Sequence, residues 1–318
     1  RTGFEDIYEH DPIPASRVKR VAVIGGGPAG IQCATLASMR GHHVTLYEQT
    51  SRLGGMLVPG SVPRIKYEVA NYLTYLENQT AACQSAYGLA VKLNTRADVD
   101  LLREGHFDSL VVCVGARPIQ LNVPGAALSQ VVQAVDVFRQ PSMVEGAEEV
   151  VIVGGGAVGC ECAHYLAAEH GKKVTILEML PAFMAGLCTA NRGHLIHSLE
   201  RMGVKLINCA RLLEVEPGRV RVERNVSSTV PDPMITWAPL LPENVKNPLR
   251  RPIQKQLETI WMKADQVVLA VGLRADDSLY RACVEARVAP EILSIGDAFA
   301  VGRVFEAVKA GFAVGRSL

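Results

Sequence analysis

Two stretches of the chain repeat one pattern of apolar and polar positions. In each, a continuous apolar run is followed by a glycine-rich turn, a helix-like segment of small residues, and a second apolar run that ends in glutamate. Uninterrupted apolar runs of this length are typical of strands in a parallel sheet, which is buried on both faces. The expected strands are Val21–Ile24 and Val44–Tyr47 in the first stretch, and Glu149–Val153 and Lys173–Leu177 in the second.

Three glycines of the first turn each have a distinct structural role. Gly25 allows a tight turn, Gly27 lets the backbone approach a pyrophosphate, and Gly30 lets the helix pack against the strand. A phosphate would then lie at the helix N-terminus, where unpaired N–H groups and the helix dipole favour an anion. Glu48, 18 residues after Gly30, is placed to accept hydrogen bonds from ribose hydroxyls.

The second turn follows the same plan, with Gly154, Gly156 and Gly159 placed 129 residues after their counterparts. Its second strand ends in Glu178, 19 residues after Gly159. A single glycine-rich turn is weak evidence for a nucleotide site, because such turns are common. Two copies in the same strand–turn–helix–strand context predict two dinucleotide sites.

Composition places the chain among ordinary globular proteins and narrows its partners. The 318 residues suffice for about two domains, and 48% of them are hydrophobic against 20% charged. A net charge of +1 favours neither nucleic acid nor an acidic membrane surface as a partner. No uncharged apolar run approaches the ~18 residues of a membrane helix, and the first ten residues show no signal-peptide pattern. Eight scattered cysteines predict no disulfide framework and favour a cytoplasmic location.

Further motifs place glycine at the ends of apolar strands or beside a carboxylate. They are Gly54-Gly55 shortly after Glu48, Gly296-Asp297 after the short strand 292–295, and Gly115 and Gly272 after two other apolar strands. Together with the two turns, these motifs resemble the two-dinucleotide-binding-domain flavoproteins, the glutathione-reductase-like family. The resemblance implies an α/β fold with two Rossmann-like domains, with FAD in the first site and a nicotinamide cofactor in the second.

The resemblance also divides the chain and assigns its residues. Residues 1–16 are expected to form a lead-in, residues 17–118 and 264–318 the FAD domain, and residues 119–263 an NAD(H) domain inserted in it. FAD contacts are expected at Gly25, Gly27, Pro28, Ala29, Gly30, Glu48, Gly54, Gly55, Gly115 and Asp297, the last binding the ribityl chain. NAD(H) contacts are expected at Gly154, Gly156, Val158, Gly159, Glu178 and Gly272.

Glu178 indicates which nicotinamide cofactor the second site takes. A carboxylate at this position accepts from the ribose 2′-hydroxyl of NADH but repels the 2′-phosphate of NADPH. The residues that follow, Met179–Phe183, supply no arginine to bind that phosphate. We therefore expect NADH in preference to NADPH.

The chain lacks the cysteine pairs that disulfide reductases of this family use. No cysteine occurs in Met56–Pro63, directly after the Gly-Gly turn, and the second domain has no Cys-x-x-Cys. Cys160 and Cys162 are two residues apart on an expected helix, so their side chains point to different faces. A dithiol relay is therefore not expected.

A narrower resemblance covers the segments around both turns. Several segments look like the FAD/NAD(H) half of the long old-yellow-enzyme-like reductases. They are Leu53–Gly55, Ser61–Pro63, Lys66, Tyr72-Leu73 and Gly171–Leu180. This is the group of 2,4-dienoyl-CoA reductase, trimethylamine dehydrogenase and enoate reductases. In that group an N-terminal FMN barrel carries a four-cysteine iron–sulfur site, which would lie here on an absent domain or a partner. This chain lacks the barrel and the clustered cysteines, so we expect either a fragment of a larger reductase or a dedicated subunit of one. The start at Arg1 rather than Met favours the fragment.

The expected reaction is hydride transfer from NADH to FAD, followed by electron transfer to the partner. Arg64 and Lys66 follow the Gly-Gly turn, where the family places a cation near the flavin, and Glu161 is expected near the flavin–nicotinamide junction. Two alternatives stay open. One is a free-standing NADH:acceptor oxidoreductase that uses quinone, dye or oxygen, and the other is a non-catalytic nucleotide-binding scaffold.

Two remaining features of the sequence give weaker indications of function. His194 and His197 are three residues apart on an expected helix, but no third ligand is near in sequence, so no metal site is expected. The Pro-rich stretch Pro231–Arg251 ends in basic residues. We expect a long surface loop of the NAD(H) domain there, with docking of the partner as the alternative.

Overall fold

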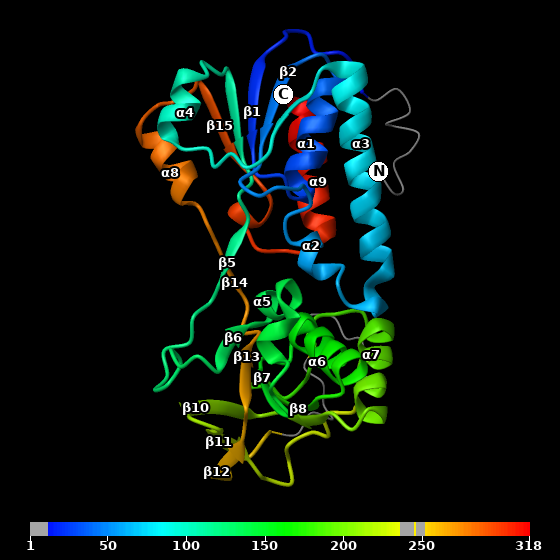
Figure 1. Ribbon diagram of the computed structural model, residues 1–318, viewed down its shortest axis with the longest axis vertical. Helices are drawn as coiled ribbons and strands as arrows, with labels where there is room; N and C mark the ends of the chain where they lie inside the picture. The colour runs from blue at the N-terminus through cyan, green and yellow to red at the C-terminus, as the bar shows by residue number, and fades with distance from the viewer. Residues whose placement is uncertain (1–11, 236–244, 246–251) are drawn as a thin grey trace. The chain divides into compact units, whose positions relative to one another are not determined.

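The computed structural model describes residues 12–235, 245 and 252–318. These residues form two compact units (Figure 1). Unit 1 comprises the chain up to Arg117 together with Leu273–Leu318, and unit 2 comprises Pro118–Gly272. Most of the expected lead-in, and residues 236–244 and 246–251 of the Pro-rich stretch, lie outside the described residues.

Unit 1 contains a central parallel sheet with helices on both faces. Its elements are β1 (Arg20–Ile24), α1 (Pro28–Met39), β2 (His43–Tyr47), α2 (Leu57–Gly60), η1 (Arg64–Lys66), α3 (Tyr67–Tyr87), β3 (Ala90–Lys92), α4 (Val99–Glu104), β4 (Ser109–Val112), β5 (Ala116–Pro118), β14 (Leu273–Ala275), α8 (Ser278–Glu285), β15 (Glu291–Ser294), η3 (Gly296–Ala298) and α9 (Val304–Ser317). The strand order is β15-β4-β1-β2-β3, and each neighbouring pair is parallel.

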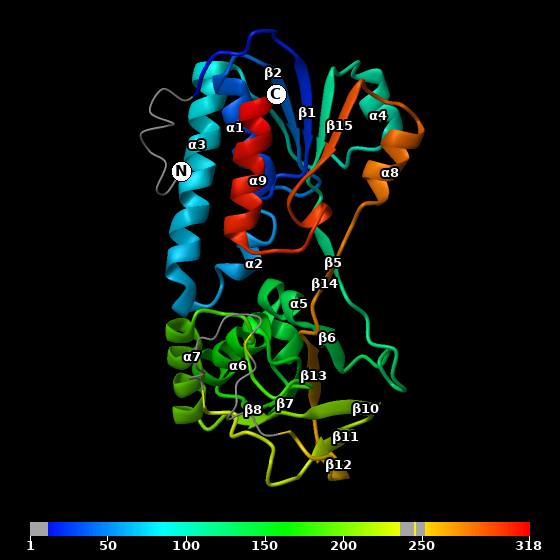
Figure 2. The same cartoon turned by 180° about the vertical axis from the view of Figure 1, so that it is seen from behind.

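The two faces of the unit 1 sheet have separate cores. Helices α1, α3 and α9 lie together on one face, and α4 and α8 lie on the other (Figures 1 and 2). Val21 and Val23 of β1 face the first group, while Ala22 faces the second, because successive side chains of a strand alternate. All three side chains are fully buried, which explains the uninterrupted apolar run in the sequence.

Unit 2 repeats this plan and adds a small antiparallel sheet. Its elements are β6 (Val131–Gln133), α5 (Ala134–Arg139), η2 (Pro141–Val144), β7 (Glu149–Val153), α6 (Ala157–His170), β8 (Lys173–Leu177), α7 (Thr189–Arg201), β9 (Lys205–Ile207), β10 (Ala210–Glu216), β11 (Arg219–Asn225), β12 (Leu257–Lys263) and β13 (Gln266–Leu269). The parallel sheet has the order β6-β13-β7-β8-β9, and β10-β11-β12 pack against its apolar face. The predicted α/β fold with two Rossmann-like domains is therefore confirmed.

The second boundary between the units differs from the one expected from the sequence. We expected the chain to return to the first domain at residue 264, whereas unit 2 continues to Gly272. The reason is β13, which pairs with β6 and β7 and so completes the sheet of unit 2. Which cofactor each unit binds stays a prediction.

Among the described residues, no helix combines the length and the apolar surface needed to cross a membrane.

The third glycine of each turn brings the following helix against the preceding strand. A Cβ on Gly30 would lie 1.9 Å from the Gly25 carbonyl oxygen, and a Cβ on Gly159 would lie 1.9 Å from the Gly154 carbonyl oxygen. Both obstacles are backbone atoms, which cannot move aside as a flexible side chain could. Only glycine therefore fits these two positions.

We expect Gly30→Ala and Gly159→Ala each to lower the free energy of unfolding by about 1–3 kcal/mol, the usual cost of overpacking. Urea unfolding of the purified chain measures this effect. Gly146→Ala is the matched control, because Gly146 is exposed and has open space where its Cβ would lie. Equal stability of the three variants would contradict the packing argument.

His42 is a buried histidine at the start of the unit 1 sheet. Its side chain is 2% exposed, and its Nδ1 accepts a hydrogen bond from the Lys19 N–H at 3.1 Å. Nε2 has no hydrogen-bond partner among the described residues. Burial, followed by the nearby charges of Arg40 and Lys19, lowers the pKa of His42 below its ordinary value of 6.5. The folded chain therefore holds this ring neutral.

The lowered pKa of His42 predicts that acid destabilises the fold. Below about pH 6.5 the unfolded chain binds a proton at this ring that the folded chain excludes, so stability is lost as the pH falls through that range. We expect the urea midpoint to drop less between pH 7.5 and pH 5.5 in His42→Asn, whose amide oxygen can still accept from Lys19. The wild type at the same two pH values is the reference, and an equal drop in both proteins would contradict this role of His42.

Candidate nucleotide-binding sites

The two glycine-rich turns occupy equivalent places in the two sheets. Each lies at the carboxyl end of the central strand, beside the point where the strand order reverses, which is where open α/β sheets bind ligands. Gly25 has φ +112°, and a Cβ there would lie 2.3 Å from the Cys113 carbonyl oxygen. Gly154 has φ +108°, and a Cβ there would lie 2.4 Å from the Ala270 carbonyl oxygen. The first glycine thus lets the backbone of each turn pass close to the backbone that follows the neighbouring strand.

The middle glycine of each turn faces open space. No described atom lies within 4 Å of the position that a Cβ would take on Gly27 or on Gly156. Helices α1 and α6 begin directly after these glycines, with Pro28 as the first residue of α1, and neither helix has an acidic residue in its first turn. The N-terminus of each helix therefore offers N–H groups and a positive dipole end that fit a pyrophosphate.

A glutamate at the end of the second strand is fixed beside each turn. Glu48 accepts through Oε2 from the Gly26 N–H at 2.8 Å and through Oε1 from Thr50. Glu178 accepts through Oε2 from the Gly155 N–H at 2.6 Å and through Oε1 from the Leu180 N–H at 2.7 Å. Glu48 Oε1 is occupied by both the N–H and the hydroxyl of Thr50, whereas Glu48 Oε2 and both oxygens of Glu178 each accept one hydrogen bond. Each carboxylate therefore keeps at least one oxygen with a lone pair that can accept from a ribose hydroxyl.

The repeat extends further than the sequence indicated. Six residues after each glutamate, a backbone N–H donates to the glycine that lies between the first and the middle glycine of the turn: Gly54 donates to Gly26 O at 2.7 Å, and Met184 donates to Gly155 O at 2.8 Å. The side chain one position earlier, Leu53 or Phe183, fills the space beneath that glycine. Sequence reasoning missed Phe183 and Met184, although their spacing from Glu178 matches that of Leu53 and Gly54 from Glu48.

The two sites differ at the position after this returning N–H. In unit 1 it is Gly55, with φ +53°, where a Cβ would lie 3.0 Å from Gly27 Cα. In unit 2 it is Ala185, and the preceding Met184 has the unusual φ of +47° for a residue other than glycine. Position 55 therefore carries no side chain beside Gly27, whereas position 185 carries a methyl group.

Asp297 lies in η3, shortly after the strand β15 of unit 1 ends at Ser294, and it follows Gly296, which has φ +61°. Its Oδ1 accepts from the Gly302 N–H at 3.0 Å, and its Oδ2 accepts no hydrogen bond from the described residues. Burial raises the pKa of Asp297, and the charge of Glu306 acts in the same direction. A half-buried carboxylate with an open oxygen fits the expected contact with a ribityl hydroxyl.

The three expected catalytic residues are spread over both units. Arg64 is exposed and Lys66 half-buried in η1 of unit 1, and Glu161 is half-buried on α6 of unit 2. Ala29 is buried at the start of α1, and Val158 is half exposed at the start of α6. The assigned roles of these residues stay predictions.

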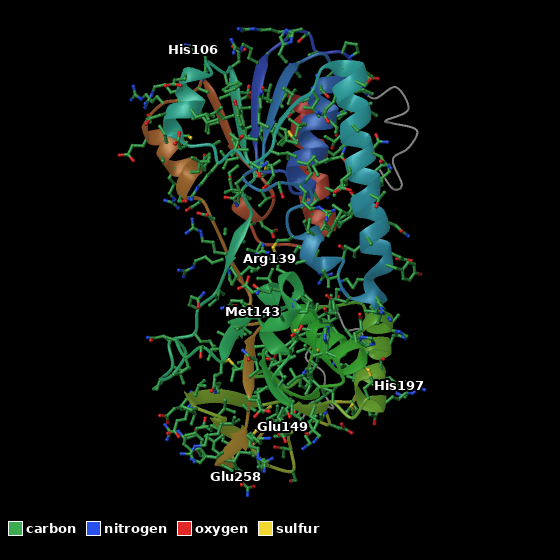
Figure 3. The ribbon with its side chains drawn as sticks, viewed as in Figure 1. His106, Arg139, Met143, Glu149, His197 and Glu258 are labelled. Carbon is green, nitrogen blue, oxygen red and sulfur yellow. The ribbon has the colours of Figure 1, made fainter. Side chains whose placement is uncertain are left out.

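The two thiols of α6 are unsuited to redox chemistry. All eight cysteines are free, and Cys160 and Cys162 are fully buried on α6. Burial raises the pKa of each of these two thiols to about 12, so neither forms a thiolate at neutral pH. In the described part of the chain, no three His, Cys, Asp or Glu side chains group as metal ligands. His197 points outward from α7 and pairs with Glu200 at 3.5 Å (Figure 3).

Comparison with known proteins places this geometry in a family. Residues 19–292 match the family described as pyridine nucleotide-disulphide oxidoreductase. NADH oxidase of Thermoanaerobacter brockii is 32% identical over 315 residues, covering 98% of this chain and 42% of that protein. Cinnamate reductase of Clostridium sporogenes is 29% identical over 308 residues, covering 96% of this chain and 40% of that protein.

A solved structure likewise matches nearly all of this chain with less than half of its own length. The complex of 2-naphthoyl-CoA reductase with 2-naphthoyl-CoA matches with a TM-score of 0.80 and 28% identity, covering 97% of this chain and 42% of that one. This chain thus spans about two fifths of the length of these relatives. It belongs to the pyridine nucleotide-disulphide oxidoreductase family, as an FAD/NAD(H) module of the enoate and dienoyl-CoA reductase group.

Proposed function

We propose that the chain is an NADH-oxidising FAD module that takes hydride from NADH in unit 2 and passes it to FAD in unit 1. The observation that carries this proposal is the duplicated site, in which an open glycine at a helix N-terminus lies beside a fixed glutamate. One such site would serve a single nucleotide. Two in one chain fit a donor and an acceptor.

The assignment of FAD to unit 1 rests on two features that unit 2 does not share. The Gly54-Gly55 backbone carries no side chain beside the first turn, and Asp297 supplies a half-buried acceptor after β15. Bound FAD would supply the hydride acceptor and the site from which electrons leave singly. The chain itself binds and orients the two nucleotides, and the cations of Arg64 and Lys66 would favour negative charge near the flavin.

Electrons would leave for an FMN and iron–sulfur reductase domain or subunit. The relatives are more than twice as long as the matched part, so they contain further protein beyond this module. The names cinnamate reductase and 2-naphthoyl-CoA reductase favour an unsaturated acid or its thioester as the final acceptor. We place the module in the cytoplasm, because eight free cysteines suit a reducing compartment.

A second candidate function is direct oxidation of NADH by a small acceptor such as oxygen. It is favoured by the relative named NADH oxidase, which is 32% identical. Oxygen consumption by the isolated chain separates the two functions. Rapid reoxidation of the reduced chain by air favours the oxidase, and slow reoxidation favours the module with a partner.

We expect anaerobic NADH to bleach the flavin absorbance of the FAD-loaded chain at one NADH per FAD, with NADPH at least about tenfold slower. The physical reason is Glu178, whose negative charge opposes a 2′-phosphate. Stopped-flow absorbance measures both rates. If FAD binds but neither nucleotide bleaches it, hydride transfer is wrong for this chain and a nucleotide-binding scaffold is favoured.

Glu178→Ala tests the carboxylate directly. We expect NADH affinity to fall about tenfold, the loss of one charge-assisted hydrogen bond to a ribose hydroxyl, while NADPH affinity does not fall. FAD affinity, measured by flavin fluorescence, should stay at the wild-type value because Glu178 lies in unit 2. Glu200→Gln, an exposed change on α7 of the same unit, is the control.

Gly27→Ala tests the phosphate cradle without disturbing packing. Its φ of −77° suits alanine, and the space for a Cβ is open, so we expect wild-type stability. The added methyl group would occupy the place proposed for the pyrophosphate, so FAD affinity should fall about tenfold or more. Gly146→Ala is again the control. Unchanged FAD affinity in Gly27→Ala would contradict the assignment of the FAD pyrophosphate to this turn.

A further inference from the structure

The chain connects its two units through a paired ribbon, β5 with β14 (Figures 1 and 2). At one end the Ile119 N–H donates to Gly272 O at 3.1 Å, and at the other the Asp276 N–H donates to Gly115 O at 3.2 Å. Residue numbers rise along one strand and fall along the other, as in an antiparallel pair. Each strand is three residues long, so few backbone bonds resist twisting of the ribbon.

A glycine in the left-handed region stands at each end of this ribbon. Gly115 has φ +84° and Gly272 has φ +103°. Neither is required by close packing: the nearest described atom to a Cβ on Gly272 would be Ile119 Cδ1 at 3.6 Å, and around Gly115 no described atom lies within 4 Å. Residues at element ends with this freedom are those that absorb backbone rotation in hinges.

An ion pair spans the ribbon between these glycines. Arg117 of β5 donates through Nε at 2.7 Å and through Nη2 at 2.6 Å to Oδ2 of Asp276, which directly follows β14. The other oxygen of Asp276, Oδ1, accepts from Ser278 Oγ at 2.6 Å, at the start of α8. The carboxylate is thus anchored to α8 on one side and holds Arg117 on the other.

The charge of Asp276 is stable in this position. Burial disfavours its ionised form, but the hydrogen bonds from Ser278 and Arg117 outweigh this effect and hold the pKa of Asp276 below its ordinary value. The Asp276 side chain is 18% exposed and that of Arg117 is 68% exposed. The pair is therefore permanent near neutral pH but modest in strength, because water and salt screen its outer partner.

We propose that Arg117 and Asp276 form a latch that fixes the twist of the β5–β14 ribbon, and that Arg117 is a positioning residue for hydride transfer. The kinetic part rests on the proposed function. The two nucleotides are assigned to different units. The rate of hydride transfer therefore depends on the fraction of time that the ribbon connecting the units keeps the conformation that allows transfer. The mechanical part, control of the ribbon, concerns only the chain itself.

Amide hydrogen exchange tests the mechanical part without any cofactor. In Arg117→Ala we expect the amides of Ile119 and Asp276 to exchange about threefold faster, the effect of losing a partly exposed pair. Amides of β1 and β7 should be unchanged, since the pair touches neither sheet. Arg281→Ala is the matched control, because Arg281 pairs with the neighbouring Asp277 at 2.6 Å on α8 but lies off the ribbon. Unchanged exchange at Ile119 and Asp276 would overturn the latch.

Stopped-flow reduction by NADH tests the kinetic part. We expect Arg117→Ala to slow flavin bleaching about threefold at saturating NADH, with unchanged NADH affinity and FAD affinity. Arg117→Lys should recover part of the rate, and the difference from wild type should shrink at high salt. Faster ribbon exchange with an unchanged bleaching rate would reject the positioning role. Absence of bleaching in the wild type would instead reject the proposed function, while the exchange result still decides the latch.

Discussion

The whole arrangement depends on backbone contacts that leave no room for a side chain. The carbonyl oxygen of Gly25 touches the helix at Gly30, and the same contact joins Gly154 to Gly159. This contact sets the distance between the central strand and its helix, and so directs the helix N-terminus at the edge of the sheet. The open glycine, the fixed glutamate and the returning N–H all take their places around it.

The duplicated plan explains how one chain can serve two nucleotides and still distinguish them. Both turns are closed beneath by an apolar side chain, Leu53 or Phe183, and both are tied by a backbone N–H. The two sites differ at the next residue, Gly55 or Ala185, and unit 1 also has the carboxylate of Asp297, which follows β15 near the end of the chain. The shared parts suit a pyrophosphate, and the differing parts suit what is attached to it.

Much of the fold was predictable from local pattern. Strands β7 and β8 have the predicted bounds, and β1 and β2 each begin one residue earlier than expected. Periodicity succeeded there because each strand is buried on both faces and its sequence shows this directly. The unit division near Gly272 could not be predicted in the same way, because β13 pairs with strands more than a hundred residues earlier, which no local pattern reveals. The pairing of Arg117 with Asp276 and the place of Phe183 beneath Gly155 are also long-range contacts.

The buried thiols have a consequence for where this chain can work. Burial raises the pKa of Cys33, Cys160 and Cys162 to about 12 and that of Cys113 well above its ordinary value. The thiolate is the form that peroxide oxidises and that iron binds, and burial keeps these four sulfurs in the protonated thiol form. These four sulfurs are therefore poor targets for an oxidant or for a metal ion that reaches the chain.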